Sequence, residues 1–256
     1  PNTKPAIQTK NEVQYVQSKA SGWITDLVIQ AAATKDCKGE DFTDILDLHH
    51  EGVFVYGDGT HPISNPDRLL KILQYLQKFG GLLFDQTYDP YLSLFGQMHE
   101  GVASTRLGMK GIPNLSEEIA VHRNLEILKY AGGKLHLQTI STKGAVDKIR
   151  EAKKEGLNVT ADVSLYQLLF SDEDMASFDT NLKVMPPFRG KEDRKALIKG
   201  LKDGTIDAIV SNHQPQDFDS KFMEFDLAAF GMAGLQTFLP GMSKLAEELT
   251  WPLLIS

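Results

Sequence analysis

A polar segment at residues 211–216, with the sequence SNHQPQ, follows the short apolar run 206–210. An apolar run of this length after a helix is typical of a buried parallel strand. Proteins of the α/β class place their chemistry at the carboxyl ends of such strands. Asn212, His213 and Gln216 therefore form a candidate site that offers amides and one imidazole but no acid. Such amides can hydrogen-bond a polar ligand, but they carry no titratable proton near neutral pH.

These residues and one acid at another strand end also have simpler interpretations. Asn and Gln are common in turns, so Asn212 and Gln216 could serve only to cap the strand. A lone histidine such as His213 makes structural hydrogen bonds more often than it ligates a metal. Asp58 lies in a Gly-Asp-Gly sequence after an apolar run, where it is either a functional acid or part of a tight turn.

The elements that must position these residues alternate along the chain. The expected strands are 23–31, 53–56, 82–84, 134–140, 157–163 and 206–210, and the expected helices are 10–20, 42–50, 65–79, 116–130, 142–155, 191–203 and a last region at 228–249. Ser116 is the expected N-cap of its helix. Such alternation predicts a parallel sheet with right-handed crossovers.

Six strand–helix units and a truncated one at Pro1 predict an α/β fold of the TIM-type (β/α)8 barrel class. We expect residues 1–256 to form a single barrel domain truncated at its start, with the first strand and a small flanking β domain outside this chain. A doubly wound open sheet is the alternative, which the lack of a GxGxxG or P-loop sequence weakens. The two longest loops follow strand ends at Gln86 and Val163, where long loops are usually functional.

Composition and charge argue against several classes of function. The net charge of -7 and the lack of a Lys/Arg-rich block argue against nucleic-acid binding. No apolar run reaches the ~18 residues of a membrane span, and the start does not resemble a signal peptide. A single cysteine, Cys37, excludes an internal disulfide and suits a reducing compartment. We therefore expect a cytoplasmic protein that binds neither nucleic acid nor membranes.

Five motifs stand in order along the chain: PNTKP at 1–5, LHLQTIST at 135–142, DTNLKVMPPFR at 179–189, SNHQPQ at 211–216 and AFGMAGLQT at 229–237. Together they resemble motifs of dihydroorotase, a cyclic amidohydrolase of pyrimidine biosynthesis in the amidohydrolase superfamily. The resemblance covers nearly the whole chain. It implies a hydrolase that converts dihydroorotate to N-carbamoyl-aspartate at one or two zinc ions, which lower the pKa of a bound water and polarise the carbonyl.

Four positions depart from the pattern that this resemblance implies. Family His ligands of zinc correspond to Gln86 and Thr139, the catalytic Asp to Asn212, and a substrate-binding His to Gln216. Amide and hydroxyl oxygens are poor zinc ligands, and Asn cannot accept a proton near neutral pH. We therefore assign no metal ligand and expect no cofactor, and Asn212 marks a degenerate catalytic position. The candidate pocket residues are Asn2, Asp58, Gln86, Thr139, Asn181, Asn212, His213 and Gln216.

The sequence is compatible with three functions. The first is a pseudoenzyme of the dihydroorotase family that acts as a scaffold or binding partner. Non-catalytic homologues of this family assemble aspartate transcarbamoylase, so the expected partner is that enzyme or a second copy of the chain. The second is an active, zinc-dependent dihydroorotase that uses an upstream H-x-H and Asp58, with or without one of the loop histidines. The third is a metal-free protein that binds a small pyrimidine-like ligand through its amides.

Overall fold

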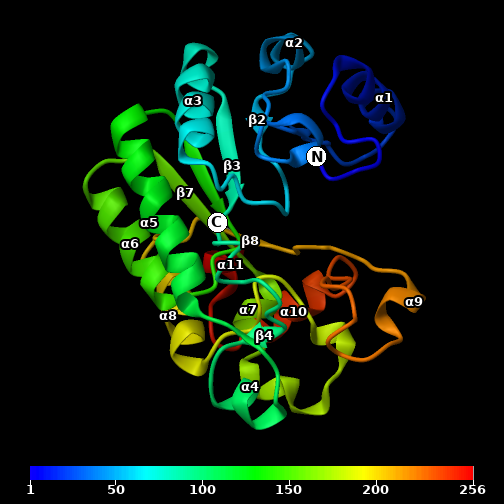
Figure 1. Cartoon of the computed structure of the whole chain (residues 1–256), viewed down its shortest axis with the longest axis vertical. Coiled ribbons are helices and arrows are strands. Elements are labelled where there is room, and N and C mark those ends of the chain that lie inside the picture. The colour runs from blue at the N-terminus through cyan, green and yellow to red at the C-terminus, as the bar shows by residue number, and fades with distance from the viewer. Residues whose placement is uncertain (256) are drawn as a thin grey trace. The chain divides into compact units, whose positions relative to one another are not determined.

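The computed structural model describes residues 1–255 as two compact units built from alternating strands and helices (Figure 1). The first unit comprises residues 1–87, 120–138 and 152–159. The second unit comprises residues 88–119 and 139–151 and the chain from residue 160 onward. Within the described residues no helix is both long enough and apolar enough to span a membrane.

The first unit is organised around four parallel strands. In order across the sheet these are β1 (Gln30–Ala31), β2 (Val55–Tyr56), β3 (Leu82–Gln86) and β6 (Leu135–Gln138). The helices that contribute to this unit are α1 (Lys10–Ala20), α2 (Ile45–His50), α3 (Pro66–Leu76) and most of α5 (Asn114–Ala131). The register pairs Phe84 with His136 and Gln86 with Gln138, so each pair lies on one face of the sheet.

Helix α3 illustrates how local sequence builds this unit. The side chain of Asn65 accepts from the backbone N–H groups of Asp67 and Arg68, and Pro66 occupies the first helical position. Four apolar residues at helical spacing are buried: Leu69, Ile72, Leu73 and Leu76. This stripe packs the helix beside β3, as Figure 1 shows.

The second unit pairs β7 (Val159–Ser164) with β8 (Ala208–Val210) in parallel and holds a separate parallel pair, β4 (Met98–His99) and β5 (Gly111–Ile112). Its helices are α4 (Val102–Leu107), most of α6 (Lys143–Lys154), α7 (Leu165–Leu169), α8 (Lys191–Lys202), α9 (Phe218–Lys221), α10 (Phe238–Leu245) and α11 (Trp251–Ile255). One apolar cluster consists of Met98, Tyr166, Met175, Val184, Phe188 and Phe225. Most of its members come from the two long loops, which are therefore packed segments with their own short elements.

Three expected elements differ in the structure. Only Gln30–Ala31 of the expected strand 23–31 is a strand, and Trp23, Ile24 and Val28 are exposed, because an apolar run forms a strand only where a neighbouring strand pairs with it. The long helix begins at Asn114, two residues before Ser116. The Ser116 hydroxyl does not act as an N-cap but donates to the Asp89 carbonyl over 2.9 Å.

The last expected helical region, 228–249, is helical from Phe238 to Leu245 only. Two glycines explain its late start. Gly231 has a φ of 132°, and a Cβ atom there would lie 2.4 Å from the Gln214 carbonyl oxygen. A Cβ atom at Gly234 would lie 2.5 Å from the Ser211 carbonyl oxygen. This stretch therefore runs close against the residues that follow β8 and cannot be helical there. The helix at 10–20 is confirmed as predicted.

Candidate functional site

Asn212 follows β8 in the second unit, and both ends of its carboxamide are engaged. Its Nδ2 donates to the Tyr166 hydroxyl, while its Oδ1 accepts from Gln214 Nε2 over 2.8 Å. Burial raises the pKa of Tyr166 far above its ordinary value, so the phenol keeps its proton at neutral pH. The group at this position is therefore a neutral amide hydrogen-bonded to a neutral phenol. It can hold a polar ligand, but it cannot take up a proton.

Thr139 directly follows β6 and is 5% exposed. Its backbone N–H donates to Asp162 Oδ1 over 2.7 Å. Both Thr139 and Asn212 have left-handed backbone conformations, with φ values of 50° and 40°. A β-branched residue rarely adopts such a conformation, whereas Asn tolerates it better. The backbone turns sharply at both positions although neither is glycine, and strain of this kind clusters at functional sites.

The remaining second-unit candidates make local hydrogen bonds. His213 is exposed, and its Nδ1 accepts from the backbone N–H groups of Gly234 and Leu235, both over 3.2 Å. This atom is thus already occupied as an acceptor. Gln216 Nε2 donates to the Phe230 carbonyl over 2.9 Å. Asn181 Nδ2 donates to Asp179 Oδ1 over 3.0 Å. For all three residues the simpler, structural interpretation accounts for these contacts.

In the first unit, Asn2 and Asp58 lie together but act on the backbone. Asn2 Nδ2 donates to the Asp58 carbonyl over 3.1 Å and lies 3.2 Å from His61 Nδ1. The Asp58 carboxylate is 1% exposed and accepts from the N–H groups of Ala33 and Thr34 and from the Thr34 hydroxyl. Burial raises the pKa of Asp58, and these donors oppose the rise. The carboxylate thus holds the turn at 33–34.

Gln86 ends β3 and is 6% exposed. It lies beside Gln138 in the register with β6, two residues after the stacked pair Phe84 and His136, whose rings are 4.2 Å apart. Because side chains alternate along a strand, all four side chains lie on one sheet face. His136 thus lies opposite its neighbours Leu135 and Leu137, as the alternation predicts. Stacking on Phe84 gives it a packing role.

The second unit holds a buried charged network that the sequence did not predict. The Glu117 carboxylate accepts from the N–H and hydroxyl groups of both Ser141 and Thr142. Arg189 Nε donates to Ser141 Oγ over 3.1 Å, and its Nη1 donates to the Ile112 carbonyl over 2.7 Å. Glu117 and Arg189 are each 3% exposed. Ser141 and Thr142 lie in the motif at 135–142, and Arg189 ends the motif at 179–189. These two motifs are the feature of the sequence that could have indicated the network.

Opposing influences set the charge of this network. Burial raises the pKa of the Glu117 carboxyl, while Arg189 and the donors from Ser141 and Thr142 oppose that rise. His99 lies with its Nδ1 3.4 Å from Arg189 Nη1 and is half-buried. Burial and the nearby guanidinium lower the pKa of His99. The network joins the strand pair β4–β5 to the start of α6.

The residues present do not fit zinc. Across residues 1–255, no three His, Cys, Asp or Glu side chains group closely enough to hold a metal ion. The positions that the resemblance assigns to metal and base carry the carboxamides of Gln86 and Asn212 and the hydroxyl of Thr139. Zinc sites use thiolate, imidazole and carboxylate ligands. We therefore derive no catalytic step through a metal at these residues.

The sequence of this chain is similar to those of dihydroorotases. The dihydro-orotase-like family model matches residues 1–145. The dihydroorotase of Thermoanaerobacter sp. (strain X514) is 43% identical over 239 residues, which make up 93% of this chain and 55% of the relative. That of Syntrophus aciditrophicus (strain SB) is 37% identical over 249 residues, 97% of this chain and 58% of the relative. The chain thus spans somewhat more than half the length of these relatives.

Solved structures confirm the fold class. The L-hydantoinase (dihydropyrimidinase) from Arthrobacter aurescens aligns with a TM-score of 0.81 at 21% identity, covering all of this chain and 58% of that one. The Saccharomyces cerevisiae dihydroorotase in complex with 5-fluoroorotic acid aligns with a TM-score of 0.72 at 17% identity, covering 97% and 69%. The predicted α/β fold of the TIM-barrel amidohydrolases is therefore confirmed. With the family model matched over more than half of its residues, the chain belongs to the dihydro-orotase-like family.

Proposed function

We propose that this chain is a non-catalytic member of its family, which acts as a scaffold or binding partner. The observation that carries the proposal is the donor set at the family's metal and base positions. Carboxamides occupy two of these positions and a hydroxyl the third, at Gln86, Asn212 and Thr139. The Asn212 amide is moreover hydrogen-bonded at both ends within the chain.

The expected effect on catalysis is large. A single positioned proton-transfer group contributes about 10² to 10⁴ in rate. An Asn in place of the family Asp removes that contribution. Replacement of two imidazoles by Gln86 and Thr139 weakens the hold on zinc, which supplies the attacking hydroxide in this family. These losses act on one reaction, and together they favour a protein that has kept the barrel without the hydrolytic activity.

The partner and the pathway are part of the same proposal. A scaffold of this family would serve pyrimidine biosynthesis in the cytoplasm, with aspartate transcarbamoylase or a second copy of the chain as its partner. A small pyrimidine-like ligand is a further candidate, because amides can hydrogen-bond an imide edge without a metal. Such a ligand would have to displace the present partners of Asn212. A thermal-shift screen with orotate, dihydroorotate and hydantoins detects such binding as a raised melting temperature.

The second candidate function is an active, zinc-dependent dihydroorotase. The observation that favours it is the identity of up to 43% with curated relatives named dihydroorotase. A zinc site in that case needs ligands other than Gln86 and Thr139, and a base other than Asn212.

Enzyme assays separate the two functions. The full-length protein is assayed with added zinc for interconversion of dihydroorotate and N-carbamoyl-aspartate, beside the Thermoanaerobacter relative as positive control. We expect activity at least about 10³-fold below that control, since two metal ligands and the base are lost together. The triple variant Gln86→His, Thr139→His and Asn212→Asp serves as the restored comparison. If the unmodified protein reaches the activity of the control, the proposal is wrong and the second candidate stands.

A further inference from the structure

Residues 217–227, with the sequence DFDSKFMEFDL, place large apolar side chains on the surface of the second unit. Phe218 and Phe222 are 72% and 78% exposed, and Met223 and Leu227 are 42% and 67% exposed. The two phenylalanine rings stack with their centroids 5.0 Å apart. We name these four residues the aromatic face. Figure 1 shows α9, which begins at Phe218 and is followed directly by Phe222, on the stretch of chain between β8 and α10.

The backbone beneath the aromatic face is held in place by two lysines. Lys221 Nζ donates to the carbonyls of Thr180 and Ala229, each over 2.8 Å. Lys183 is 2% exposed, and its Nζ donates to the Phe225 carbonyl over 2.7 Å. The same ammonium group lies 4.8 Å from the centroid of the Phe230 ring. The exposed rings therefore stand on a tethered segment, and a preordered surface loses little conformational entropy on binding.

The exposed charged side chains of this segment are all acidic. Both lysines direct their ammonium groups to backbone carbonyls, whereas four exposed acids neighbour the aromatic face along the chain: Asp217, Asp219, Glu224 and Asp226. No ion pair is found for these four among the described residues. A shallow concavity of about 470 Å³ lies beside the face. Its lining is Thr180, Lys221, Phe222, Met223 and Glu224.

We propose that the aromatic face docks a basic, amphipathic helical segment of a partner protein. The partner's apolar side chains would cover Phe218 and Phe222, and its Lys or Arg side chains would meet the surrounding acids. Exposed apolar patches with a polar rim mark interaction sites, and aromatic residues dominate the binding energy at such sites. The negative rim disfavours anionic lipid surfaces and nucleic acids. The inference rests on the proposed scaffold role and assigns it a surface.

A model peptide tests this docking surface. The probe is a fluorescent helical peptide built only from Leu and Lys, and the control peptide has Glu in place of every Lys. We expect the Lys peptide to bind the full-length protein and the Glu peptide not to bind. We also expect affinity to fall as salt is raised. The double variant Phe218→Ala and Phe222→Ala is expected to weaken binding about tenfold or more, with an unchanged melting temperature.

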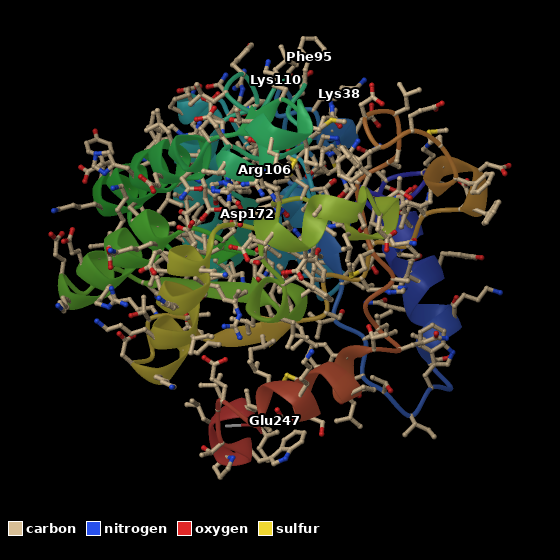
Figure 2. All side chains as sticks on the ribbon, turned by 90° about the horizontal axis from the view of Figure 1, so that it is seen from below. Lys38, Phe95, Arg106, Lys110, Asp172 and Glu247 are labelled. Atoms are coloured by element: carbon tan, nitrogen blue, oxygen red, sulfur yellow. The ribbon has the colours of Figure 1, made fainter. Side chains whose placement is uncertain are left out.

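Phe95 provides a matched control for an exposed aromatic residue. It is also 72% exposed, but its ring lies 5.4 Å from Lys110 Nζ, and Figure 2 shows the two side chains next to one another. Phe95→Ala is expected to leave peptide binding unchanged. Equal binding of both peptides, or equal loss in Phe95→Ala and the double variant, overturns the proposal.

Sedimentation of the protein alone tests whether a second copy occupies the face. If the wild type self-associates and the double variant is monomeric, a second copy is the occupant and the proposal of a basic partner is wrong. Neither measurement involves zinc or turnover. A hydrolytically active protein that still binds the Lys peptide would refute the proposed function and leave the docking surface standing.

Discussion

Replacing Arg189 with Met tests the buried charged network of the second unit. Arg189 is 3% exposed, and the change removes its hydrogen bonds to Ser141 Oγ and the Ile112 carbonyl, at 3.1 and 2.7 Å. It also leaves the Glu117 carboxylate buried without the positive charge that opposes its protonation. Glu117 and Arg189 both bond to the Ser141 hydroxyl, and removing one of two such buried opposite charges leaves the other uncompensated at a cost of about 3–5 kcal/mol. We expect a loss of that size in the free energy of unfolding by urea at neutral pH.

Two comparison variants make this prediction specific. Lys195→Met removes an ion pair between Lys195 and Glu192, two side chains that are 69% and 78% exposed, and should cost far less than Arg189→Met. Adding Glu117→Gln to Arg189→Met should recover about 1 kcal/mol or more, because the buried negative charge is then gone. A loss below about 1 kcal/mol in Arg189→Met, or strict additivity in the double variant, would refute the reasoning.

The pH dependence of Arg189→Met adds a second check. Burial raises the pKa of Glu117 in the folded protein, and removal of Arg189 raises it further. A carboxyl whose folded pKa is raised binds protons more readily in the folded state. Its contribution to stability is present below the unfolded pKa and is lost as pH rises through the folded pKa. The loss in free energy of unfolding of Arg189→Met, relative to the wild type, should therefore shrink as pH falls towards 5. A loss that does not change with pH would contradict the buried Glu117 charge as its cause.

Further predictions concern individual buried groups. Burial lowers the pKa of Lys183 to about 8, so the folded state releases this proton more readily and stability rises with pH between about 8 and 10.5. The free energy of urea unfolding of the wild type minus that of Lys183→Met should therefore grow by up to about 3 kcal/mol across that window. A difference that does not change with pH would contradict this prediction. Asp58→Asn should lower the free energy of thermal unfolding by about 1–3 kcal/mol, because the Asp58 carboxylate holds the turn at 33–34. A loss of ligand binding or turnover without destabilisation would instead indicate that Asp58 is a site residue. Thr139→Gly should cost at least about 1 kcal/mol less than Thr43→Gly, another buried threonine, because glycine relieves the left-handed backbone at Thr139 and only there.

The barrel class could be predicted because it depends on alternation along the chain. Buried stripes such as that of α3 and short apolar strands such as β8 are local patterns with a clear period. The prediction of a strand over all of 23–31 was wrong, because an apolar run becomes a strand only where another strand pairs with it. Such pairing depends on residues far away in the sequence. The prediction that Ser116 is an N-cap was wrong for a related reason, since its hydroxyl donates to the Asp89 carbonyl, 27 residues earlier in the chain.

The candidate site was only partly accessible from sequence. Motif positions identified Asn212 and Thr139, and the structure adds that both are left-handed and that Asn212 is hydrogen-bonded to Tyr166. Nothing in the sequence singled out Tyr166, because a tyrosine in the largely apolar stretch 165–170 after a strand resembles a core residue. Glu117 and Arg189 lie 72 residues apart in the sequence, and no periodicity predicts that two charged side chains at that separation share a buried network.

The zinc content of the purified full-length protein tests the central claim most directly. The protein is loaded with excess zinc, dialysed and measured by elemental analysis beside the Gln86→His, Thr139→His, Asn212→Asp variant. The account predicts well under one zinc ion per chain in the unmodified protein, since imidazole and carboxylate ligands are replaced by amides and a hydroxyl. One or two tightly held zinc ions per unmodified chain would contradict it.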